Sequence, residues 1–129
     1  MSASANPVTW FEIYVKDMAR AKSFYEKTLG TKLKKLDTPA AEVSEMYAFP
    51  MGNDNYGSTG ALVKMDGGPA GGGAGTIVYF ECDDCAVEAG RIQGNGGKIA
   101  KEKFPIGPHG FIALGSDTEG NMFGLHSMK

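Results

Sequence analysis

The sequence has few of the features that mark nucleic-acid-binding, membrane or secreted proteins. Its formal net charge is −2 and it has no basic run, which argues against nucleic acid or an anionic membrane as a partner. No apolar run approaches the roughly 20 residues of a membrane-spanning helix. The first residues, MSASANP, have neither the basic nor the apolar segment of a secretory signal. We therefore expect a cytoplasmic protein, and 129 residues are enough for one domain with a hydrophobic core.

Cysteine is also scarce, since only two occur, as CDDC at positions 82–85. A C-x-x-C spacing is typical of a redox pair or of half a zinc site. A zinc site needs a second ligand pair, and His109 and His126 lie too far apart in sequence to resemble one. We therefore favour two buried thiols, with Cys82 at the end of a strand and Cys85 at the start of a helix.

Glycine, by contrast, is abundant, with 19 residues, and many of them gather in one stretch. Residues 66–75 read DGGPAGGGAG, which offers no packing side chains and has high backbone entropy. No Gly-Lys-Ser/Thr follows, so a phosphate-binding loop is disfavoured. We interpret residues 67–75 as a linker within a single domain (1–129), between a first module at about 8–66 and a second at 76–128.

The two halves on either side of this linker repeat one pattern. Each begins with an alternating strand that ends in Asp, WFEIYVKD at 10–17 and IVYFECDD at 77–84. A Gly stands thirteen residues after each Asp. Asp is a good helix N-cap and Gly a good C-cap, so a helix is predicted in each half, over 18–30 and 85–97.

The halves also end alike. The pattern G-x-D-x-x-G followed by a short strand occurs in GNDNYGSTGALVKM (52–65) and in GSDTEGNMFGLHSM (115–128). Each half has room for two further strands, which we expect at 32–37, 45–50, 98–103 and 111–115. Each half therefore reads as β-α-β-β-β, repeated once along the chain.

The alternation of the first strand assigns its side chains to two faces. Phe11 and Ile13 are expected to face the helix. Trp10, Glu12 and Tyr14 point the other way, although a carboxylate between two aromatic residues is unusual on a water-facing side. We therefore expect this second face to line a concave and mostly apolar ligand site.

The pattern resembles the vicinal oxygen chelate superfamily, which includes glyoxalase I, extradiol dioxygenases and bleomycin resistance proteins. The likeness is carried by EIYVKDMARAKSFYEKTLG near the start and DTEGNMFGLHS at the end, and it is greatest for small bacterial glyoxalase-related proteins. It implies an α+β fold in which two paired βαβββ modules form a curved mixed sheet around a cavity. It also implies a small-molecule ligand and modules that pair within a chain or across a dimer, and we expect a homodimer.

The metal enzymes of this superfamily place one ligand on the first and last strand of each module. The resemblance puts these positions at Trp10, Ala61, Ile77 and Gly124, and none of these side chains binds a divalent ion. The usual metal site is therefore expected to be absent, together with the glyoxalase and dioxygenase reactions that depend on it. No cofactor is predicted, and a divalent metal held by other ligands stays open.

Two residues further along the same strands, the equivalent positions hold Glu12, Val63, Tyr79 and His126. We predict that Glu12 and His126 form a polar pair in the cavity, with Glu12 as general base or acid. The alternatives are a carboxylate satisfied by a nearby lysine such as Lys16, and an ordinary histidine at a strand end.

Aromatic residues are expected to form the wall of this site, namely Trp10, Tyr14, Tyr79 and Tyr47. His109 lies in FPIGPHGF (104–111), a loop with two prolines and two glycines before a strand. It is either a plain turn histidine or part of a lid over the cavity mouth.

Three functions stay open. A metal-independent enzyme, such as a lyase or isomerase, would use Glu12 to move a proton on a carbonyl or enol-type substrate, with His126 or Tyr79 as electrophile. A binding protein would sequester an antibiotic or metabolite between aromatic walls without catalysis. A metal-dependent isomerase, lyase or dioxygenase would need non-standard ligands.

Overall fold

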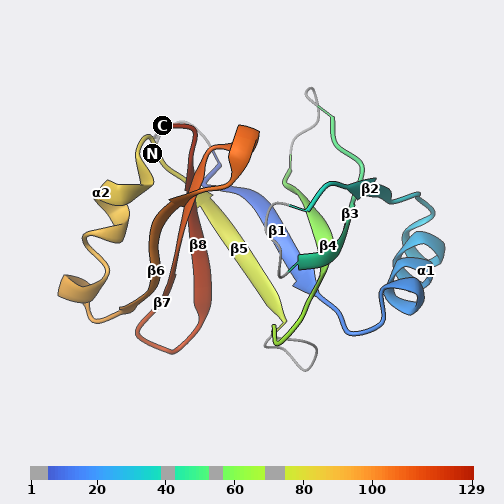
Figure 1. Cartoon of the computed structure of the whole chain (residues 1–129), viewed down its shortest axis with the longest axis horizontal. Helices are drawn as coiled ribbons and strands as arrows, with labels where there is room; N and C mark the ends of the chain where they lie inside the picture. Colours follow the sequence, from blue (N-terminus) through green and yellow to red (C-terminus); the bar gives the residue numbers. More distant parts are fainter. Residues whose placement is uncertain (1–5, 39–42, 53–56, 69–74) are drawn as a thin grey trace. The chain divides into compact units, whose positions relative to one another are not determined.

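The computed structural model describes residues 6–38, 43–52, 57–68 and 75–129. The chain divides into two compact units, one formed by Trp10–Thr76 and one by Ile77–Lys129 together with the residues up to Thr9. In Figure 1 the helix and strands of the first unit run from blue to green, and those of the second from yellow to red. Most of the predicted glycine-rich linker, residues 69–74, lies outside the described residues. Within the described ranges no helix is long and apolar enough to cross a membrane.

The unit formed by Trp10–Thr76 has the predicted order of elements. These are β1 (Val8–Tyr14), α1 (Met18–Leu29), β2 (Lys34–Leu36), β3 (Val43–Ala48) and β4 (Thr59–Met65). Its strands lie in the order β2-β3-β4-β1, with β1 parallel to β4 and the other neighbours antiparallel. Strands β2 and β3 and helix α1 lie between β1 and β4 in sequence, which gives the long connection that a parallel pair requires.

The other unit repeats this arrangement with two short 3₁₀ turns added. Its elements are β5 (Thr76–Glu81), α2 (Cys85–Ala89), η1 (Gln93–Asn95), β6 (Lys98–Pro105), η2 (Gly107–His109), β7 (Phe111–Ser116) and β8 (Met122–Ser127). The strand order is β5-β8-β7-β6, with β5 parallel to β8 and the remaining pairs antiparallel. The predicted α+β class with a β-α-β-β-β repeat is confirmed.

The two units also share the register of their parallel strands. In each unit, residues at the same distance from the helix-capping Asp lie opposite equivalent residues of the last strand. The equivalent cross-strand pairs are Glu12–Ala61 with Tyr79–Gly124, and Tyr14–Val63 with Glu81–His126. Because cross-strand partners share a face of the sheet, the sequence repeat fixes which side chains stand together.

Helix α1 agrees with the prediction, and α2 does not. Asp17 caps α1 by accepting a hydrogen bond from the backbone N–H of Arg20 at 3.0 Å, and Gly30 ends it in the left-handed conformation with φ 66°. The prediction of a helix over 85–97 is wrong, because α2 has only 5 residues. Gly90 follows directly, and glycine in a helix interior costs about 1 kcal/mol relative to alanine.

Helix α1 packs on the face of β1 that the alternation predicted. Met18 and Leu62 are buried there, and Ile13, Val15 and Tyr25 pack around them. The predicted orientation of Ile13 toward the helix is confirmed, and so is that of Phe11, whose ring lies 5.4 Å from that of Phe49, a further member of the same cluster. Trp10, Glu12 and Tyr14 therefore lie on the face of β1 opposite α1.

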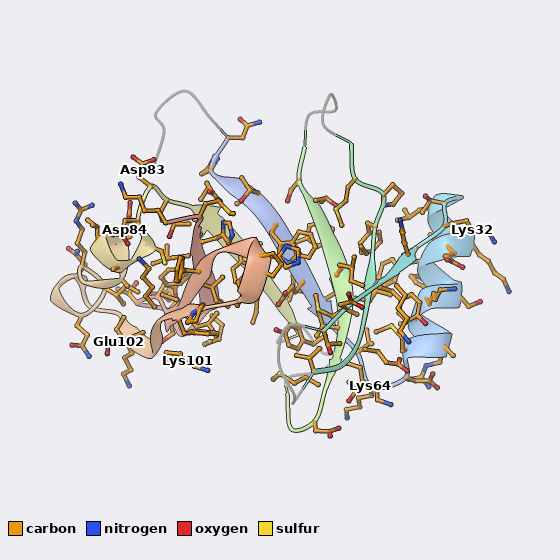
Figure 2. All side chains as sticks on the ribbon, turned by 45° about the horizontal axis from the view of Figure 1, so that its top comes forward. Lys32, Lys64, Asp83, Asp84, Lys101 and Glu102 are labelled. Carbon is orange, nitrogen blue, oxygen red and sulfur yellow. The ribbon has the colours of Figure 1, made fainter. Side chains whose placement is uncertain are left out.

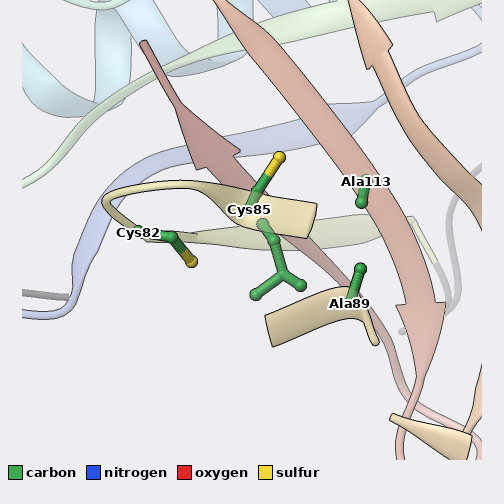
Figure 3. Close-up of a cluster of buried hydrophobic side chains, with 5 residues drawn as sticks. Cys82, Cys85, Ala89 and Ala113 are labelled. Carbon is green, nitrogen blue, oxygen red and sulfur yellow. The ribbon is translucent and has the colours of Figure 1, made fainter. Parts of the chain in front are cut away.

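Helix α2 packs on the strands of its unit through Cys85 and Ala89, and Cys82 joins the same cluster from the segment before the helix. Cys82 and Cys85 are free thiols with 5% and 0% of their surface exposed, and they cluster with Ala89, Ala113 and Leu125 (Figure 3). The predicted pair of buried thiols is confirmed. Burial raises the pKa of the Cys82 thiol to about 12, because the charged thiolate loses its hydration.

Candidate functional site

A carboxylate with two hydrogen-bond donors stands on the face of β1 opposite α1. The indole Nε1–H of Trp10 donates to Oε2 of Glu12 at 3.1 Å, and the hydroxyl of Tyr14 donates to Oε1 at 2.7 Å. Side chains two residues apart on a strand point to the same face, so the alternation of β1 itself brings the three together. All three are half-buried. An ionised carboxylate only accepts hydrogen bonds, so this arrangement holds Glu12 as a fixed acceptor.

The surroundings of this carboxylate are apolar. Trp10 and Tyr14 pack against Ala61 and Val63, which have 0% and 1% of their surface exposed. Ala61 is also the cross-strand partner of Glu12. The predicted combination of aromatic side chains and a single carboxylate on this strand face is therefore present.

A second polar cluster stands on the face of β8 opposite α2. Nδ1 of His126 lies 2.7 Å from Oε1 of Glu81, and Nε2 lies 2.6 Å from the backbone oxygen of His109. The hydroxyl of Thr9 donates to the same Glu81 oxygen at 3.3 Å. A carbonyl oxygen only accepts, so Nε2 is the donor of that bond, and Nδ1 forms the second hydrogen bond of the ring with the Glu81 carboxyl group.

Tyr79 lies beside this cluster and covers Gly124. A Cβ atom at Gly124 would lie 2.2 Å from the ring carbon Cδ2 of Tyr79, whose side chain is buried. The phenol ring therefore fills the space that any larger side chain at position 124 would need.

The side chains at the four positions that the resemblance assigns to metal ligands offer no suitable ligand atom. The indole nitrogen of Trp10 is a hydrogen-bond donor only, and Ala61 and Ile77 have no donor atom for a metal. Gly124 has no side chain, and the ring of Tyr79 occupies its place. In the part of the chain that the structure describes, no three His, Cys, Asp or Glu residues group so that they could hold a metal ion.

Two predicted ligand-binding residues differ in placement or in role. Tyr47 lies opposite Leu62 and packs in the cluster under α1, apart from the cluster that holds Trp10, and its place in the wall of a ligand site stays a prediction. The ammonium group of Lys22, on α1, lies 5.4 Å from the centroid of the Tyr47 ring. His109 ends the η2 turn with an exposed side chain, and it reaches His126 through its backbone oxygen.

Glu81 was not among the residues predicted from the sequence. It stands two residues after Tyr79 on the same face of β5, so the alternation that singled out Glu12 in the first half could have indicated it. The FECDD segment was interpreted for its cysteines and for the Asp that caps the helix, but not for its glutamate. Glu81 and His126 are cross-strand partners, and that pairing depends on the register of β5 against β8.

Glu12 and His126 belong to different units, and each is hydrogen-bonded within its own unit. Their pairing stays a prediction. A hollow of about 460 Å³ lies along the last turns of α1 and the following residues, between Lys22 and Lys32. It includes none of the predicted site residues.

The chain is similar in sequence to proteins of a known superfamily. Residues 8–125 match the sequence model of the Glyoxalase/Bleomycin resistance protein/Dioxygenase superfamily. A "glyoxylase-like domain-containing protein" of Didymella fabae is 29% identical over 115 residues, which are 88% of each chain.

Solved structures with the same fold cover nearly the whole chain. A hypothetical protein from Bacillus halodurans C-125 is similar with a TM-score of 0.72 at 17% identity, over 98% of this chain and 96% of that one. Methylmalonyl-CoA epimerase of Streptomyces coelicolor, in complex with 2-nitronate-propionyl-CoA, is similar with a TM-score of 0.67 at 18% identity, over 96% and 98%. At these identities the likeness concerns the fold.

Proposed function

Because the chain belongs to the Glyoxalase/Bleomycin resistance protein/Dioxygenase superfamily, we propose that it binds a small molecule through Glu12 and His126 without the superfamily's usual metal site. The observation that carries this proposal is the carboxylate of Glu12, which accepts hydrogen bonds from Trp10 and Tyr14 on an otherwise apolar strand face. Removing a charged group from water is costly unless hydrogen bonds are supplied. A carboxylate retained in such surroundings with two dedicated donors is suited to contact a ligand.

The chemistry that fits this carboxylate is proton transfer. Glu12 would take a proton from the carbon next to a ligand carbonyl and return it, as a general base and acid. His126 would donate a hydrogen bond to the ligand's oxygen through Nε2, which faces a carbonyl oxygen in the structure, while Nδ1 is paired with Glu81. Solved neighbours of the fold include an epimerase in complex with methylmalonyl-CoA, which supports a carbonyl compound as the ligand class.

The second candidate function is a binding protein that sequesters a metabolite or antibiotic without changing it. One observation favours it, because both ring nitrogens of His126 already have hydrogen-bond partners. In this state His126 supplies no second group for proton transfer.

As a separate proposal, we expect a homodimer in solution, the commonest symmetric assembly, and light scattering measures it directly.

Native mass spectrometry of the purified protein tests the site. The wild-type protein is expected to retain a small molecule, and Glu12→Gln to lose it. Glu102→Gln makes the same chemical change at an exposed position of β6 (Figure 2) and is the matched control, which should retain the compound. Undiminished retention by Glu12→Gln would show that Glu12 is not the ligand's polar contact.

Deuterium exchange separates the two candidate functions. The retained compound is incubated in deuterium oxide with wild-type protein or with Glu12→Gln, and its mass is followed. Uptake of deuterium at a carbon with the wild-type protein alone supports proton transfer by Glu12. Release of an unlabelled compound supports sequestration.

Tyr14→Phe keeps the ring and removes the 2.7 Å hydrogen bond to Glu12, so it should weaken retention of the compound without unfolding the strand.

A further inference from the structure

We infer that His126, oriented by Glu81, is a donor site for a carbonyl or carboxylate oxygen, and that the backbone carbonyl of His109 takes that oxygen's place in the free protein. This inference rests on the proposed small-molecule function, because it names the chemical group that the site recognises. It adds Glu81 as a positioning residue and η2 as the segment that the ligand displaces.

The contacts of His126 define its role as a donor. The Nε2–oxygen distance of 2.6 Å is slightly below the usual range for an N–H···O hydrogen bond, and the acceptor is a carbonyl. Glu81 lies 2.7 Å from Nδ1, a distance typical of a charge-assisted bond. A carboxylate at one imidazole nitrogen fixes the orientation of the ring, and so the direction in which the other nitrogen donates. The Nε2–H group is thus held toward an oxygen atom.

The partners of the ring come from three sides, and one of them, the His109 carbonyl, is the acceptor that a ligand oxygen would replace. The hydroxyl of Thr9 donates a hydrogen bond to Oε1 of Glu81 at 3.3 Å. Ile112 of β7 is the cross-strand neighbour of His126 on its other side. The His109 carbonyl belongs to an exposed turn, so the acceptor of the Nε2–H group lies in a segment that water reaches.

The turn can release the His109 carbonyl while the hydrogen bond that closes the loop stays formed. The backbone N–H of Ile106 donates to the oxygen of Gly110 at 2.9 Å and closes the loop. The carbonyl of His109 lies in the peptide that joins it to Gly110, which has φ 98°. Rotation of that peptide changes φ of Gly110, and glycine adopts either sign of φ at little steric cost. The rotation breaks the long 3.3 Å bond from the Gly110 N–H to Gly107 and the bond from His126 to the His109 carbonyl.

A titration with sodium acetate, followed by NMR of protein labelled with ¹⁵N and ¹³C, tests the inference. Acetate is expected to shift the His126 Nε2 signal and the His109 carbonyl signal together and to saturate. Glu81→Gln should weaken this response about tenfold, as expected when a charged hydrogen-bond partner is lost. Glu81→Asp, which keeps the charge, should restore most of it, and Glu102→Gln should not change it. The ring ¹⁵N signals report the protonation and hydrogen bonding of each nitrogen, and rescue by Glu81→Asp separates loss of the charged partner from a general structural change.

The outcomes separate this inference from the role of Glu12. Coupled shifts of the two signals that weaken in Glu81→Gln support it, even if Glu12→Gln keeps its retained compound. Signals that do not move with acetate, or that move equally in Glu81→Gln, overturn it, even if ligand retention depends on Glu12. His126→Phe removes both ring nitrogens and should abolish the His109 carbonyl shift; a shift that persists in this variant also overturns the inference.

Discussion

Adding one methyl group at Gly124 is expected to destabilise the protein substantially. The new Cβ would lie 2.2 Å from Cδ2 and 2.3 Å from Cε2 of Tyr79, and only 5% of Tyr79 is exposed. Carbon atoms do not approach so closely, so the buried ring must move. Overpacking of this kind costs about 1–3 kcal/mol. Gly124→Ala should therefore lower the free energy of unfolding by about this amount.

Urea unfolding followed by fluorescence measures the effect. A slope of roughly 1–3 kcal/mol per molar urea for a small protein means that the midpoint should fall by about 1 M. Tyr79→Ala combined with Gly124→Ala is the control, because without the ring the added methyl group should cost less than about 0.5 kcal/mol. If Gly124→Ala unfolds at the wild-type urea concentration, or if its cost persists without the ring, then Tyr79 does not fill the space at position 124. The argument that the Tyr79 ring leaves no room for a metal-binding side chain at position 124 would then fail.

Three further predictions concern the helix caps and the buried thiols. Asp17→Ala should lower the free energy of unfolding by about 1 kcal/mol, because α1 loses its cap to Arg20, and an unchanged urea midpoint would contradict this. The Cys82 thiol, with its pKa raised to about 12, should not react with Ellman's reagent at pH 8 until the protein is unfolded, and rapid reaction of the folded protein would show that it is accessible. Lys103 donates to Asp84 at 2.8 Å and lowers the pKa of that carboxyl group, so its contribution to stability is present above about pH 4 and is lost as the pH falls through the lowered pKa. Asp84→Asn should therefore be less stable than wild type at pH 7 and equal to it near pH 2, whereas a constant difference would rule out this linkage.

Much of the fold could be predicted because the sequence repeats local signals at fixed spacing. Asp17 and Asp84 both cap helices, and the strands before them alternate as expected. The second helix was predicted too long because the capping rule was applied to Gly97. Gly90 stands earlier in the same run, and its backbone freedom disfavours continuation of the helix.

The candidate site could be predicted only where its contacts are local. Glu12 lies two residues from both of its donors on one strand, so alternation alone placed the three together. Glu81 and His126 are 45 residues apart and meet only through the register of β5 against β8. The face taken by Tyr47 likewise depends on how β3 pairs with β4, which the local pattern does not contain.

The affinity of the retained compound for Glu12→Gln, measured by calorimetric titration after treatment of the protein with EDTA, tests most directly whether Glu12 holds the ligand without a metal. Wild-type affinity should be unchanged by EDTA. The affinity of Glu12→Gln should be weaker by about tenfold to a hundredfold, since a hydrogen bond to a charged group contributes roughly 1.5–3 kcal/mol. Equal affinity in Glu12→Gln, or loss of binding by the wild-type protein on chelation, would contradict it.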